Sequence, residues 1–146
     1  MIERTPPPGT SHRGVTPATT ARIIHLTVTA STVLMAAIGW ALRGRFAAPS
    51  AATGALAFAA YALAASGLMA GFSLRRLIPG RGSSQPELDW WRSHLGKAIA
   101  IWAIGESIVL FGAVVLAVSG QLLPFGAAAA AGLALLAATT PARLAE

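Results

Sequence analysis

Only one formally charged residue, Glu106, lies between Lys97 and Arg143 in this sequence. A stretch of this length can form two helices that each cross a hydrocarbon core of about 30 Å, at a rise of about 1.5 Å per residue. The whole chain is 55% hydrophobic and 11% charged, whereas about a quarter of the residues of a soluble domain are charged. The pattern therefore predicts a membrane protein rather than a water-soluble fold.

Four apolar segments predict an all-α fold. The first has 17 uncharged residues, from Leu26 to Leu42, between arginine residues. The connection over residues 119–123 is so short that it forces the last two segments into an antiparallel hairpin. We expect a four-helix transmembrane bundle of two antiparallel hairpins, with spans over about 23–42, 53–74, 97–118 and 124–140.

The membrane domain is expected to cover residues 22–142, after a disordered cytoplasmic tail of residues 1–21. This tail is rich in threonine, serine and glycine and contains four prolines, Pro6, Pro7, Pro8 and Pro17, a composition typical of disorder. An alternative interpretation of the first apolar segment is a secretory signal, because two alanines follow Met35. The long basic tail and the three further spans favour a helix that is retained.

Lysine and arginine residues are distributed unequally between the two sides of the predicted bundle. With four spans, the tail, the central loop and the C-terminus share one side. That side holds nine basic residues: Arg4, Arg13, Arg22, Arg75, Arg76, Arg81, Arg92, Lys97 and Arg143. The other side holds Arg43 and Arg45. By the positive-inside rule, both termini are expected in the cytoplasm, as for a multi-pass protein of a bacterial inner membrane.

The net charge of +6 does not indicate nucleic-acid binding. The basic residues flank apolar segments and do not form a run interleaved with aromatic residues. The chain has no cysteine, and its three histidines lack the spacing of metal ligands. No Walker loop, nucleophile elbow or triad spacing is present. We therefore predict no catalytic residue, no metal and no cofactor, and nothing in the sequence indicates an enzyme.

The loop before the third span contains a pattern typical of a helix start. Ser84 and Glu87 fit a capping box, which predicts a helix that begins near Gln85. Trp90 and Trp91 follow at the margin of the span. Tryptophans at this position usually lie at the depth of the lipid headgroups. We expect both to be interfacial anchors rather than ligand-binding residues.

Glu106 is the strongest candidate for a functional site. It follows Lys97 by nine residues, which corresponds to about 13 Å along a helix and places it near the bilayer midplane. A carboxylate at this depth is costly unless it is paired, hydrated or protonated. Ser31, Thr32 and Ser66 lie at similar distances from the cytoplasmic boundary. We expect at least one of these hydroxyl groups to form a hydrogen bond with Glu106.

Two interpretations of the polar residues around this level remain open. His25, Thr29 and Thr32 share one face of the first span and lead towards Glu106, as a proton or cation path would. Serine and threonine are also ordinary packing residues between membrane helices, and Glu106 itself can form a structural hydrogen bond between helices.

A separate packing motif lies in the second span. Gly67 and Gly71 form a GxxxG pattern. Glycines at this spacing allow the backbone of another helix to approach closely.

The segment from Gly82 to Val118 resembles the polar loop and carboxylate-bearing helix of rotor-ring proteolipids, the c subunits of ATP synthases. The matching residues are Gln85, Pro86, Glu87, Arg92, Gly105, Glu106, Phe111 and Gly112. The resemblance implies that Glu106 carries an ion. It covers about a quarter of the chain, and the second span lacks the dense glycine ladder of that family.

The chain is also similar to small, uncharacterised four-span proteins of bacterial inner membranes. These proteins carry a Gly-Glu pair in the third span, a Phe-Gly pair soon after it, and a proline before a basic residue near the C-terminus. That resemblance implies the topology but no activity.

Two functions follow from these observations. The favoured one is a scaffold or accessory subunit that acts by helix packing in the lipid bilayer, with a second copy or another membrane protein as its partner. The alternative is a proton- or ion-binding proteolipid that uses the carboxyl group of Glu106.

Overall fold

The structure is a computed structural model that describes residues 16–46 and 50–146. Within these ranges every regular element is a helix, which confirms the all-α prediction. The helices are α1 (Pro17–Ala41), α2 (Ser50–Arg76), α3 (Glu87–Ser119), α4 (Leu122–Ala138) and α5 (Pro141–Ala145). In the described part of the chain, α1, α2 and α3 are long and apolar enough to cross a membrane, while α4 is a shorter apolar helix of 17 residues. This set of helices fits a small integral membrane protein.

Two helices begin earlier than the apolar pattern predicts. Most of the expected tail, up to residue 15, lies outside the described residues, but α1 already begins at Pro17. The Thr16 side chain accepts a hydrogen bond from the Thr19 backbone N–H, and proline is well tolerated in a first turn. α3 begins at Glu87, about ten residues before the expected span but within two residues of the helix start that the loop pattern predicts near Gln85. Polar ends of membrane helices therefore escape a search for apolar residues.

The predicted capping box does not form. Pro86 is the N-cap of α3 and no side chain caps the helix. Pro86 disfavours the helical conformation of the preceding residue, Gln85. The Gln85 N–H instead donates to the Gly82 carbonyl oxygen in a turn. Glu87 lies 4.0 Å from a guanidinium nitrogen of Arg81.

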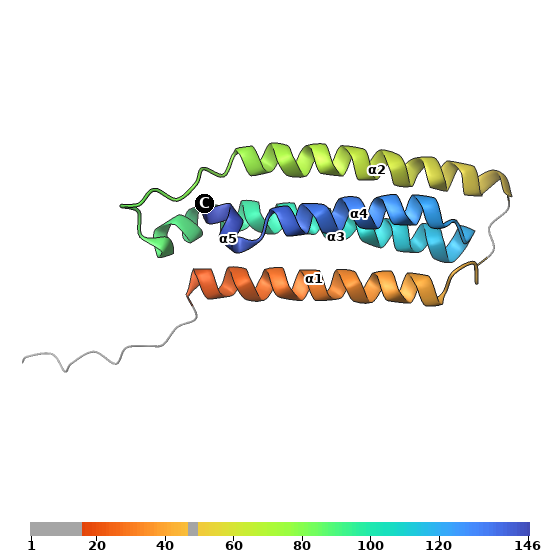
Figure 1. Ribbon diagram of the computed structural model, residues 1–146, viewed down its shortest axis with the longest axis horizontal. Coiled ribbons are helices and arrows are strands. Elements are labelled where there is room, and N and C mark those ends of the chain that lie inside the picture. Colours follow the sequence, from red (N-terminus) through yellow and green to blue (C-terminus); the bar gives the residue numbers. More distant parts are fainter. Residues whose placement is uncertain (1–15, 47–49) are drawn as a thin grey trace, which may run out of the picture.

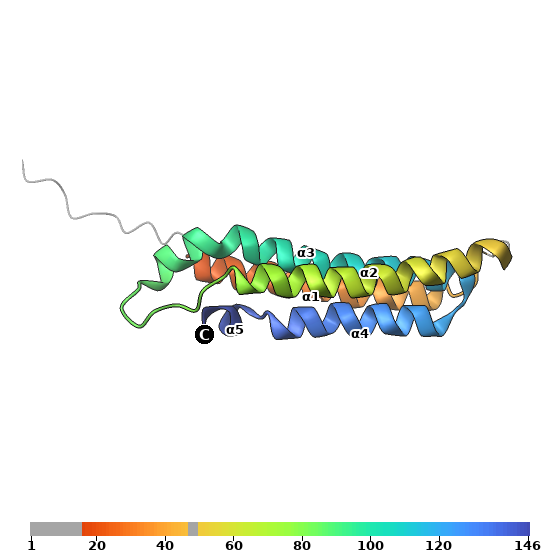
Figure 2. The ribbon, with the colours of Figure 1, turned by 90° about the horizontal axis from the view of Figure 1, so that it is seen from above.

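The four long helices lie side by side, with α1 and α2 on opposite sides of the α3 and α4 pair (Figure 1). A view from above places α3 and α4 on opposite sides of the other two (Figure 2). α3 makes extensive contacts with each of the other three long helices, whereas α1 and α2 make no comparable contact with each other. The α3 and α4 hairpin is present. The expected hairpin of the first two helices is not, because α3 and α4 separate them.

Small residues explain why α1 and α2 pack against the central pair. A Cβ atom added to Gly39 of α1 would lie 2.7 Å from the Cβ of Ala113 on α3. One added to Gly67 of α2 would lie 2.6 Å from Cδ1 of Ile108 on α3. Gly39 and Gly67 thus allow the two outer helices to approach α3 closely.

A buried aromatic and aliphatic cluster closes the end of the molecule that carries α5. Its members come from four helices and from the loop before α3: Ala21, Ile78, Trp90, Trp91, Ala98, Ile101, Trp102, Leu135, Leu136 and Leu144. The short helix α5 is tied to the loop by a hydrogen bond of 3.0 Å from the Arg81 N–H to the Ala145 carbonyl oxygen. The C-terminal segment therefore packs over the ends of the long helices.

Candidate functional site

Glu106 lies near the middle of α3 and forms a hydrogen bond with α1. The Ser31 hydroxyl lies 2.6 Å from Oε1 of Glu106, and both side chains are partly buried. The same hydroxyl lies 2.9 Å from the carbonyl oxygen of Val28, which already accepts a hydrogen bond of 2.7 Å from the Thr32 hydroxyl. Because a hydroxyl group has a single hydrogen to donate, the shorter contact assigns the Ser31 hydrogen to Glu106.

The second carboxyl oxygen of Glu106 is left available. Among the described residues, Oε2 has no hydrogen-bond partner, since the contact with Ser31 uses Oε1. The Glu106 side chain is only partly buried, so Oε2 is accessible from outside the four helices. A carboxyl oxygen at the level of an apolar span strongly favours a further polar partner.

Of the three hydroxyl groups expected near Glu106, the structure places only Ser31 against it. Thr32 is 1% exposed and its hydroxyl bonds the carbonyl oxygen of Val28 in the preceding turn. Ser66 is exposed on α2 and bonds the Ala62 carbonyl oxygen at 2.7 Å. α1 and α2 lie on opposite sides of α3, so no single α3 side chain reaches both. Counting residues from a boundary gives the level of a side chain but not its direction.

Ser66 instead faces the residue after Glu106. A groove of about 380 Å³ between α2 and α3 is lined by Ser66, Gly67 and Ala103, with Ser107 beside them. The Ser107 hydroxyl donates to the Ala103 carbonyl oxygen at 2.7 Å. α3 therefore presents one polar side chain towards α1 and the next towards α2.

His25 makes contacts that the sequence analysis did not foresee. Its Nε2 lies 3.1 Å from the carbonyl oxygen of Leu136 on α4, so Nε2 carries the hydrogen of this bond. Its ring meets the Trp102 ring edge to face, with centroids 5.0 Å apart. Trp102 donates from Nε1 to the Thr139 carbonyl oxygen at 2.7 Å. Leu136 lies in the last turn of α4 and Thr139 is its C-cap residue, so both bonds supply acceptors at the C-terminal end of the helix with a donor.

The stripe of His25, Thr29 and Thr32 does not form a continuous hydrogen-bonded path in the described part of the chain. The Thr29 hydroxyl donates to the His25 carbonyl oxygen at 2.8 Å, and the Thr32 hydroxyl also bonds its own helix. Hydroxyl groups used in this way pack as neutral small side chains.

Trp90 and Trp91 lie near the end of α3, as expected, but their surroundings differ from the prediction. An anchor in contact with lipid headgroups would be exposed, whereas Trp90 and Trp91 are 0% and 2% exposed. Trp90 donates from Nε1 to the Pro79 carbonyl oxygen at 3.1 Å, and its ring stacks on His94. Both tryptophans pack inside the cluster that α5 and the loop cover.

Gly67 and Gly71 lie at the contacts of α2 with two different helices. Gly67 approaches Ile108 of α3, and a Cβ atom added to Gly71 would lie 2.6 Å from Cδ2 of Leu135 on α4. Within this chain, the GxxxG pattern thus fits α2 into the space beside the central pair.

The residues that the structure describes contain no group of three or more histidine and acidic side chains that could hold a metal ion. The site is therefore a single carboxyl group with one hydroxyl partner. Comparison of the chain with family models, with curated proteins and with solved structures found no match.

Proposed function

We propose that this chain is a four-span protein of a bacterial inner membrane, with both termini in the cytoplasm, that acts as a scaffold or accessory subunit through helix packing. The observation that carries the proposal is the hydrogen bond between Ser31 and Glu106. It gives the intramembrane carboxyl group a structural role, because it adds a polar link to the packing of α1 against α3. Only 11% of the apolar window of α1 is buried, compared with 50% of that of α3.

Large apolar side chains on the outer surface support membrane embedding. Leu26 on α1 is 70% exposed, and Phe58 and Met69 on α2 are 75% and 72% exposed. In water, so much exposed apolar surface along two helices would cause aggregation. In a bilayer the same side chains face lipid.

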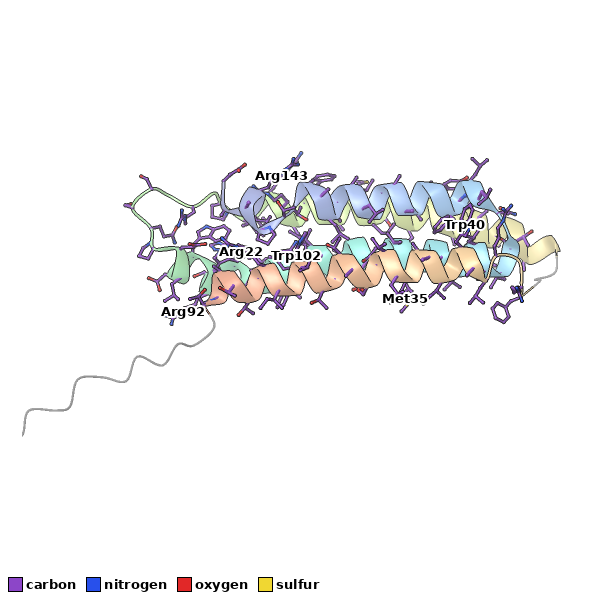
Figure 3. All side chains as sticks on the ribbon, turned by 60° about the horizontal axis from the view of Figure 1, so that its bottom comes forward. Arg22, Met35, Trp40, Arg92, Trp102 and Arg143 are labelled. Carbon is purple, nitrogen blue, oxygen red and sulfur yellow. The ribbon has the colours of Figure 1, made fainter. Side chains whose placement is uncertain are left out.

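The ends of the molecule support the orientation. Arg22, Arg92 and Arg143 gather at one end, whereas Trp40 lies near the other (Figure 3). Cytoplasmic loops carry the excess of basic residues. α4 has 17 residues, which is at the lower limit for a span, and its pairing with α3 supports a fourth crossing.

The free Oε2 atom of Glu106 favours a second candidate, a proton- or ion-binding proteolipid. A partly buried carboxyl group with one open oxygen can exchange a proton, which a fully enclosed structural group cannot. In this function Glu106 carries the proton or ion, and Ser31 orients it.

Reconstitution separates the two functions. The purified protein is placed in vesicles that contain a pH-sensitive dye, and proton flux is measured under an imposed gradient. The scaffold function predicts the same flux as in vesicles without protein, for both the natural chain and Glu106→Gln. A flux that Glu106→Gln abolishes would establish the proteolipid instead. A large ring in detergent would also contradict the scaffold, which predicts a monomer, a dimer or a complex with a partner.

A further inference from the structure

One face of α3 is left open between α1 and α2. α4 covers the opposite face, where Gly105 and Gly112 meet Leu136 and Ala128. On this face, exposed residues of α3 recur every three or four positions and form a row: Gly96, Ala100, Ala103, Ser107, Leu110 and Val114, with Lys97 and Ile99 also exposed beside it. We refer to these six residues as the open row.

The part of the open row nearest α5 is suited to another helix. Gly96, Ala100, Ala103 and Ser107 are all small, at spacings of four, three and four residues. A Cβ atom added to Gly96 would meet no other atom within 4 Å, so nothing in the chain occupies this space. Small residues at such spacing let two membrane helices approach closely.

Two polar side chains lie at one level of this face, one beside the open row and one within it. Glu106 and Ser107 are adjacent, so they differ by about 1.5 Å in height and about 100° in direction. Glu106 lies beside the row, towards α1, where it contacts Ser31, and Ser107 belongs to the row and lines the groove with Ser66 of α2. In lipid, Oε2 of Glu106 has nothing to bond with, so a polar partner at this level is favoured.

We propose that the open row docks a second copy of this chain in the same orientation, across a two-fold axis parallel to α3. This inference rests on the membrane embedding proposed above. A two-fold axis brings the α1 edge of one copy against the α2 edge of the other. Glu106 of each copy then faces Ser107 of the other at the same height.

The pairing satisfies the groups that each copy leaves open. The Ser107 hydroxyl uses its hydrogen on the Ala103 carbonyl oxygen, and its own oxygen is free to accept. A protonated Glu106 donates from Oε2 to this oxygen, and an ionised one accepts from the serine hydroxyl after it rotates. The surface is self-complementary because the donor and the acceptor lie at the same level of one face. That property selects a second copy over a lipid or an unrelated helix.

Cross-linking tests the interface directly, because the chain contains no cysteine. Ala103→Cys places a thiol on the open row, and Ala134→Cys is a matched control on the exposed face of α4. α4 runs antiparallel to α3 and Gly132 contacts Gly105, so the two alanines lie at nearly the same level. In native membranes, mild oxidation should link Ala103→Cys into dimers and leave Ala134→Cys monomeric. Equal linking of both variants, no linking of either, or a product of Ala103→Cys with a different protein would overturn the proposal.

A bulky substitution provides a second measurement. Ala103→Leu fills the row and should weaken dimerisation in vesicles by at least about tenfold, since small residues set the approach of the helices. Ala134→Leu should leave it unchanged, and single-molecule photobleaching counts the copies. Dimers of Ala103→Leu as stable as those of the natural chain would contradict the proposed surface. Alkaline extraction of the same membranes separates the two proposals: a monomer that stays in the membrane overturns the dimer alone, and release of the protein overturns both.

Discussion

The Ser31 hydroxyl on α1 donates a hydrogen bond of 2.6 Å to Oε1 of Glu106 on α3, across 75 positions of the sequence. Among the three helices long enough to cross a membrane, this bond joins the one whose apolar window has the smallest buried share to the one whose window has the largest. Its contribution is expected to be modest, because hydrogen bonds between membrane helices average about 0.6 kcal/mol and reach about 1.7 kcal/mol.

Removal of this hydroxyl group tests the link between α1 and α3. Ser31→Ala should lower the free energy of unfolding by about 1 kcal/mol, because it deprives Glu106 of its partner. Ser66→Ala is the matched control, since the Ser66 hydroxyl bonds only its own helix and should change stability by less than about 0.5 kcal/mol. Both are measured by unfolding in mixed micelles. Equal effects of the two substitutions would show that the bond does not hold α1.

A double-mutant cycle assigns the effect to the pair. Glu106→Gln keeps the size of the side chain and an oxygen that accepts from Ser31, so it should cost less than Glu106→Ala. The combination of Ser31→Ala with Glu106→Ala should cost less than the sum of the single effects, because each alone already breaks the bond. Additive effects would indicate that the two residues act independently.

The sequence predicted the helices of this fold better than their arrangement. The four apolar segments, bounded by arginine or proline, predicted α1, α2, α3 and α4. They could be recognised because a helix that faces lipid or protein must be apolar along most of its length. The same composition offers no signal for which helix lies beside which. α1 and α2 are adjacent in sequence, yet the approach of Gly39 to Ala113 and of Gly67 to Ile108 sets both against α3.

For the candidate site, too, the sequence predicted which residue matters better than how its neighbours are arranged. Glu106 could be singled out because one charge in a long apolar stretch is conspicuous, and its level identified Ser31. The direction of each side chain depends on how α3 is rotated between its neighbours, which excluded Thr32 and Ser66. The role of His25 depends on the carbonyl oxygens at the end of α4, and backbone acceptors carry no side-chain signature in a sequence.

The hydrogen bond from Trp102 to Thr139 gives a further prediction. Trp102 is 0% exposed, and its indole N–H bonds the carbonyl oxygen at the C-terminal end of α4. Trp102→Phe should cost about 1–3 kcal/mol of stability, because it leaves a buried acceptor without a partner. Trp40→Phe is the control, since Trp40 is 56% exposed and its replacement should cost less than about 0.5 kcal/mol. The two variants are compared by thermal unfolding in detergent, and similar midpoints would contradict the assigned role of Trp102.

Two glycines of α4 provide a matched test of the contact between α3 and α4. A Cβ atom on Gly132 would meet the Gly105 carbonyl oxygen and the Val109 side chain, whereas one on Gly126 would meet nothing within 4 Å. Gly132→Ala should destabilise the protein by about 1–3 kcal/mol through overpacking. Gly126→Ala should be neutral or stabilise it by up to about 1 kcal/mol, because alanine favours a helix over glycine. If both variants unfolded alike, α3 and α4 would not be in close contact.

The orientation across the membrane is tested by labelling single cysteines, which the cysteine-free chain allows without a background. Gln121 lies in the short connection between α3 and α4, and Ser83 lies in the exposed loop before α3, at the opposite ends of α3. In the proposed orientation, the excess of basic residues beside Ser83 puts that loop in the cytoplasm. A maleimide that cannot cross the inner membrane should therefore label Gln121→Cys in intact spheroplasts and should label Ser83→Cys only after lysis. Labelling of both in lysed cells controls for accessibility of the thiols. The reverse pattern in intact cells would invert the orientation, and labelling of both in intact cells would mean that α3 does not cross the membrane.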